Sequence, residues 1–105
     1  MNGKVTISPE VIRDIARVTT LATPGVLALV ERQPRHKHSP VDTGVDVEMD
    51  EDKVSIRLRI IAAVNQPLLK LGEHIQTTVA AAVAEIAGIA VASVDVSFED
   101  VRSKS

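Results

Sequence analysis

The side chains best suited to acid–base or metal chemistry in this chain are its three histidines, His36, His38 and His74. His36 and His38 flank Lys37, and a lysine between two ligands opposes the binding of a cation. Protein zinc sites use three or four ligands, and no third ligand stands at a suitable spacing. None of the three histidines belongs to a nucleophile motif. We therefore interpret them as surface side chains.

The carboxylates occur in two short runs, Asp50-Glu51-Asp52 and Glu99-Asp100. Acid–base catalysis needs a carboxyl group whose pKa is raised in a closed site. The first run is typical of a turn and the second lies near the end of the sequence, so we expect both in water. Cysteine is absent, which excludes disulfides and thiolate chemistry. No glycine-rich phosphate loop follows a predicted strand. We expect no enzyme activity, cofactor or metal site.

Residues 31–44 hold the main basic cluster, which consists of Arg32, Arg35, His36, Lys37 and His38. Two prolines and few apolar residues predict a flexible surface loop. Its cations are candidate contacts for phosphates or anionic lipid headgroups, namely Arg32, Arg35 and Lys37. Small RNA-binding modules use sheet aromatics or a Gly-x-x-Gly loop, and Phe98 is the one aromatic residue here. The net charge of −2 gives the whole molecule no positive field that would attract nucleic acid. A nucleic-acid or anionic-surface binder is therefore the alternative hypothesis, and nucleic acid is not the partner that we expect first.

The longest predicted element is a helix from Pro67 to Ala87, followed by Gly88 at the position of a left-handed C-cap. Its apolar residues recur every three or four positions, at Leu68, Leu71, Ile75, Val79, Ala82 and Ile86. The outer side carries little charge and includes Ala80, Ala81 and Ala84. Alanine is the best helix former on a solvated face. It also leaves a flat surface on which a second chain can pack, so these alanines are the candidate self-association face.

Strand patterns occur at residues 3–7, 26–30, 45–49, 54–64 and 94–98, and a shorter helix begins at Pro9 after the N-cap Ser8. Strict alternation of apolar and polar residues in 45–49 and 54–60 predicts a hairpin. The order is strand, helix, strand, strand, strand, helix, strand. Because each helix has one apolar stripe, we predict an α+β fold in two layers, with both helices on one face of a mostly antiparallel sheet.

The length of 105 residues predicts one domain over 1–105, with the flexible loop 31–44 inside it. The first residues lack the apolar run of a signal peptide. No window approaches the roughly 20 apolar residues of a membrane span. We therefore expect a cytoplasmic protein that reaches a membrane only through its surface or through a partner.

Several segments, taken in order, resemble the alkaline shock protein family of bacterial envelope-stress proteins. The resemblance is carried by residues 3–12 with Ile15-Ala16, Pro24-Gly25-Val26, residues 44–47, the helix with Ile75-Gln76 and Val79, Ala87–Val91 with Val94–Val96, and Asp100-Val101. It implies a non-enzymatic protein of cell-envelope homeostasis that self-associates and gathers at the inner face of the membrane through a membrane-anchored partner. On this basis we expect a cytoplasmic scaffold or adaptor.

Overall fold

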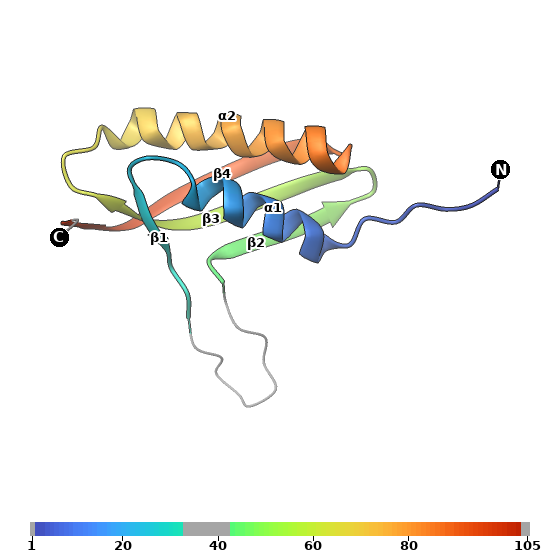
Figure 1. The fold of residues 1–105 in the computed structure, drawn as a ribbon, viewed down its shortest axis with the longest axis horizontal. Helices are drawn as coiled ribbons and strands as arrows, with labels where there is room; N and C mark the ends of the chain where they lie inside the picture. The colour runs from blue at the N-terminus through green and yellow to red at the C-terminus, as the bar shows by residue number, and fades with distance from the viewer. Residues whose placement is uncertain (1, 33–42, 104–105) are drawn as a thin grey trace.

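A computed structural model describes residues 2–32 and 43–103 of the chain. The elements follow in the order α1 (Pro9–Leu21), β1 (Val26–Leu29), β2 (Val45–Asp50), β3 (Lys53–Ala63), α2 (Leu68–Ala87) and β4 (Ala90–Arg102). Both helices cover the same face of one four-stranded sheet (Figure 1). This confirms the two-layer α+β fold expected from the apolar stripes.

The central strand of the sheet is β3, with one neighbour on one side and two on the other. β2 pairs antiparallel with its first half, from Asp50↔Lys53 to Val45↔Leu58, and β1 pairs antiparallel near its end. β4 runs parallel to β3 along its whole length, from Lys53↔Ala90 to Ala63↔Arg102. Two of the three pairings are antiparallel, as predicted. The third is parallel because α2 forms the crossover that returns the chain to the start of β3.

Residues 3–7, which the sequence pattern predicts to be a strand, pair with no strand in the described part of the chain. Figure 1 shows them leading away from the body as an extended trace. The side chain of Val5 is 90% exposed. Alternation indicates that a segment can pair, but pairing also needs a neighbour. The described sheet supplies none to this segment, so the observed order begins with α1.

The ends of the helices follow the predicted capping pattern. The hydroxyl oxygen of Ser8 accepts a hydrogen bond from the Glu10 backbone N–H at 3.2 Å, and Pro9 opens α1. α2 ends at Gly88, whose φ of 68° lies in the left-handed region and whose N–H donates to Ala84 O at 3.0 Å. The first cap fixes where α1 starts, and the second fixes where the chain leaves α2 and therefore where β4 starts.

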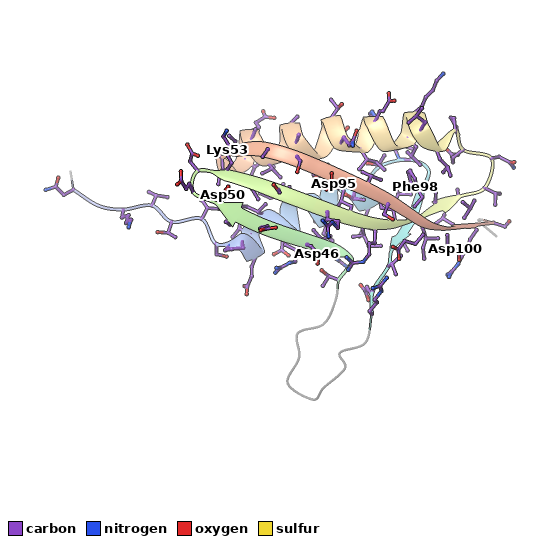
Figure 2. The ribbon with its side chains drawn as sticks, turned by 180° about the vertical axis from the view of Figure 1, so that it is seen from behind. Asp46, Asp50, Lys53, Asp95, Phe98 and Asp100 are labelled. Carbon is purple, nitrogen blue, oxygen red and sulfur yellow. The ribbon has the colours of Figure 1, made fainter. Side chains whose placement is uncertain are left out.

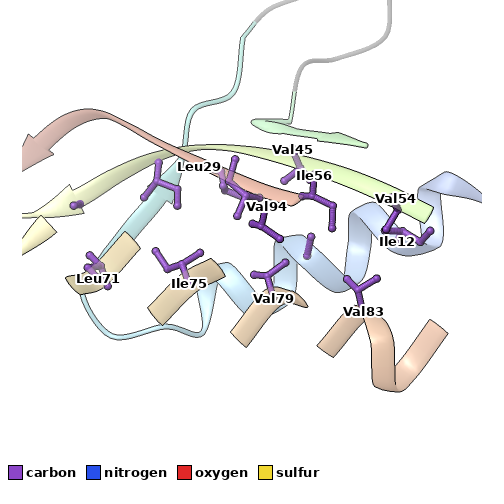
Figure 3. Close-up of a cluster of buried hydrophobic side chains, with 14 residues drawn as sticks. Ile12, Leu29, Val45, Val54, Ile56, Leu71, Ile75, Val79, Val83 and Val94 are labelled. Atoms are coloured by element: carbon purple, nitrogen blue, oxygen red, sulfur yellow. The ribbon is translucent and has the colours of Figure 1, made fainter. Parts of the chain in front are cut away.

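The hydrophobic core lies between the helices and the sheet (Figure 3). α1 contributes Ile12 and Ala16, β3 contributes alternate residues from Val54 to Ala62, and α2 contributes Ile75, Val79 and Val83. Burying one such aliphatic side chain stabilises the fold by about 1.5–3 kcal/mol. The predicted stripe of α2 is confirmed except at Ile86, which is 69% exposed. The last turn of α2 therefore adds little to this core.

Candidate interaction site

The described side chains suited to acid–base or metal chemistry lie apart on exposed surfaces. His74 is exposed on α2, and Asp50, Glu51 and Asp52 are exposed at the tip of the β2–β3 hairpin. His36 and His38 lie outside the described residues. Within 2–32 and 43–103, no three His, Asp or Glu side chains gather where they could share a metal ion. Those of the candidate residues that lie within 2–32 and 43–103 therefore share no metal site.

The face of the sheet opposite the helices is lined by charged side chains (Figure 2). The strand register places Arg57 between Asp46 of β2 and Asp95 of β4. At the hairpin end, Asp50 stands opposite Lys53. Each pair of opposite charges on neighbouring strands favours this register by about 0.2–1 kcal/mol. We call this charged surface the open face.

Arg59 is the only buried charged residue in the described part of the chain, at 8% exposure. Its Nη1 donates to Asp46 Oδ2 at 2.6 Å. The Asp46 side chain remains 56% exposed, whereas that of Arg59 is 10% exposed. The guanidinium has therefore lost more water than its partner, and the Asp46 carboxylate contributes to its compensation.

Arg32, one of the predicted anion contacts, is engaged by an acid. Its Nη2 donates to Glu99 Oε1 at 3.1 Å. This ion pair joins the chain just after β1 to β4. The other two predicted contacts, Arg35 and Lys37, lie outside the described residues, as does most of the predicted flexible loop. The basic loop thus stays a prediction, and its one described cation, Arg32, is partly neutralised by Glu99.

Asp100 lies near the end of β4 and has its pKa lowered below the usual carboxyl range. The largest cause is a hydrogen bond from Arg102 Nε at 2.8 Å, followed by one from the Val101 N–H at 2.8 Å. Both donors stabilise the ionised carboxylate. The side chain is 48% exposed and the shift favours the ionised form, so the interaction does not create a site for acid–base catalysis.

An apolar groove of about 230 Å³ lies where the first half of α2 crosses the outer side of β4. Its lining consists of Leu68, Leu69, Gly72, Glu73, Gln76, Val96 and Phe98. The helix comes close to the single aromatic ring because Gly72 has no side chain: a Cβ there would stand 3.3 Å from Phe98 Cε2. Leu69 is 78% exposed at the rim. We call this hollow the edge groove.

Gln76 marks the end of the edge groove. Its Nε2 donates to Val94 O at 3.0 Å, so a side chain satisfies this carbonyl of β4. Beyond Gln76, a more polar hollow of about 420 Å³ continues along Ala80 and the first half of β4. β4 pairs with β3 only, so its other edge faces water in the described structure.

The three alanines of the predicted self-association face lie in two different environments. Ala80 is half-buried and packs against the core beside β4. Ala81 and Ala84 are exposed on the outside of α2. Their role in self-association stays a prediction. Sequence reasoning missed the edge groove, although Leu69 lying off the apolar stripe and the solitary Phe98 were signals for it.

Comparison with known proteins gives a match over nearly the whole chain. The model of the alkaline shock protein 23 family, which is described as having a cell envelope-related function, matches residues 1–103. No curated protein and no solved structure matches the chain. Among the described helices, none has the length and apolar character needed to cross a membrane.

Proposed function

We propose that this chain, which belongs to the alkaline shock protein 23 family, is a non-enzymatic scaffold or adaptor of the cell envelope that works through self-association and protein contacts. The family supplies the cell envelope-related function. In this proposal the protein is cytoplasmic and is recruited to the inner face of the membrane by a membrane-anchored partner. The observation that supports a scaffold is the long outer edge of β4, beside an apolar groove.

An exposed strand edge is a template for another strand, and proteins usually block such edges with charges or bulges. β4 has a bulge at Ala92 and another at Glu99, where its register against β3 shifts. The segment between them, residues 93–98, pairs regularly with β3. The edge groove lies along this same segment, with Val96 and Phe98 in its lining. The part of the edge that is not blocked is thus the part with apolar side chains beside it.

The ionisable groups support docking over catalysis. The ionisable side chains of the open face lie opposite other polar groups on the neighbouring strands or are exposed to water. A catalytic acid or base needs a site from which water is excluded. Asp100 has the opposite arrangement, because its pKa is lowered at an exposed position. A surface of this kind can hold a partner in register through many weak polar contacts.

Self-association is tested by light scattering on the purified chain over a range of micromolar concentrations. We expect the mean mass to rise above the 11.2 kDa of one chain as concentration increases. A constant monomer mass at every concentration would contradict the scaffold.

Recruitment to the envelope is tested separately, by imaging a fluorescent fusion in cells and by capture of bound proteins in mild detergent. We expect the signal to follow the cell periphery and a membrane protein to be captured. An even signal throughout the cytoplasm, with no membrane protein captured, would contradict recruitment.

A further inference from the structure

The segment that precedes α1 has the sequence of a strand but pairs with none of the strands that the structure describes. We define residues 2–7 as the N-terminal arm. Lys4 and Thr6 alternate with Val5 and Ile7. Ile7 is half-buried and packs against the core of its own chain, whereas Val5 is almost fully exposed. The arm is therefore anchored beside α1 and presents one apolar side chain to solvent.

The backbone of β4 offers hydrogen-bonding groups at its outer edge. Arg59 directs its N–H to Gly44 O and its C=O to Val30 N, both at 2.9 Å and both away from β4. Its neighbours in β3 therefore face β4, and in a parallel ladder they bond the residues on either side of their Cα partners. Those partners are Val96 and Phe98, whose own N–H and C=O groups accordingly point outward. The bond from Gln76 to Val94 O agrees with this alternation.

We propose that the N-terminal arm of one copy adds as a strand to the outer edge of β4 in a second copy, with Val5 in the edge groove. The inference rests on the proposed self-association and names the two surfaces that meet. Strand addition combines backbone hydrogen bonds with one side-chain pocket. The occupant needs alternating residues, a small apolar side chain and no negative charge, and the arm has all three.

The alternating side chains of the N-terminal arm fit the outer edge of β4 in one orientation. Val5 must face the helix layer, since the edge groove lies on that side of β4. Lys4 and Thr6 then face the open side, where β4 carries the exposed Asp95, whereas Glu99 is already engaged by Arg32. A one-residue slip would put Lys4 against Leu69 and Phe98, which is unfavourable for a charge. The charge of Lys4 and the apolar side chain of Val5 thus favour the same register.

The position of the arm requires a second copy. Figure 1 shows the arm leaving the body at the end where α2 terminates, whereas the edge groove lies beside the first turns of α2. Six extended residues reach about 20 Å, and a helix of the length of α2 spans about 30 Å. The arm cannot reach its own groove. Because the arm and groove are different surfaces at opposite ends, the contact repeats head to tail and builds an open chain of copies.

Two substitutions test the arm and the groove by light scattering. Val5→Asp puts a negative charge on the arm, and Leu69→Lys puts a positive charge at the rim of the groove. Both side chains are exposed, so we expect folded proteins. Each change should weaken self-association by about tenfold or more, since it places a charge in an apolar contact. Val18→Asp and Val18→Lys are the matched controls, because Val18 is exposed on α1; they should assemble like the unchanged chain.

Mixing the two variants gives the sharper test. Val5→Asp retains a working groove and Leu69→Lys retains a working arm, so an equal mixture should form a dimer although each variant alone stays monomeric. A contact between identical surfaces would give no such rescue. If the unchanged chain assembles and both variants assemble equally well, the arm-to-edge contact is wrong while the scaffold survives. If the unchanged chain is a monomer throughout, the scaffold itself fails.

Discussion

The sheet has two faces built from alternate residues of the same strands, and different interactions stabilise the two faces. On the helix face, Val54, Ile56 and Leu58 are almost completely buried against aliphatic side chains of α1 and α2. On the open face, the residues between them include Ser55 and Arg57, which meet acids of the neighbouring strands or lie close to them. The first face supplies the stability of the fold. The second sets the register and leaves charges available for contacts.

The largest test of this contrast compares two isoleucines of α2. Ile75 is completely buried, and Ile86 is 69% exposed. Ile75→Ala should lower the free energy of unfolding by about 2–5 kcal/mol, because it removes apolar contacts and leaves a cavity. Ile86→Ala should change it by about 0.5 kcal/mol or less. Urea unfolding measures both, and equal losses would mean that the helix layer does not supply the main core.

The second test asks whether breaking an ion pair on the open face lowers the free energy of unfolding, as removing a buried side chain does. Asp46→Asn leaves the guanidinium of Arg59 with a neutral partner at a place where water is mostly excluded. We expect the free energy of unfolding to fall by about 1–3 kcal/mol. Glu48→Gln is the control, because Glu48 is exposed on the same strand and no ion pair of it occurs within the described residues. A loss as small as that of the control would show that Arg59 is stable without its carboxylate.

How far the sequence predicts these faces depends on the range of the interactions. Alternation is local, so the pattern of 45–60 predicted the hairpin and the orientation of its side chains. The same pattern in the N-terminal arm predicted a strand, but a strand also needs a neighbour, and that is decided by the whole sheet. The edge groove arises from the approach of Gly72 to Phe98, which are far apart in the chain, and no local signal gives their distance.

The third test concerns the rim between the two faces, where Gln76 donates to Val94 O. Gln76→Glu keeps the shape of the side chain but replaces the donor with a carboxylate that faces a carbonyl oxygen. We expect a loss of about 1 kcal/mol, typical of a hydrogen bond removed at a partly buried site. Glu73→Gln, on the same helix, should have a smaller effect. Equal effects would mean that the edge of β4 does not depend on this bond.

The smallest effect belongs to the exposed end of β4, and it depends on pH. The pKa of Asp100 is lowered below 3.8 in the folded chain by Arg102 and the Val101 N–H, so the folded state binds this proton less readily than the unfolded state. The resulting stabilisation is present at neutral pH and disappears as the pH falls through the lowered value. Asp100→Asn should therefore unfold at a slightly lower temperature than the unchanged chain at pH 7, and the difference should vanish in acid. A difference that persists at a pH below the lowered pKa would assign the effect to the shape of the side chain, because the carboxylate charge is then lost in both states.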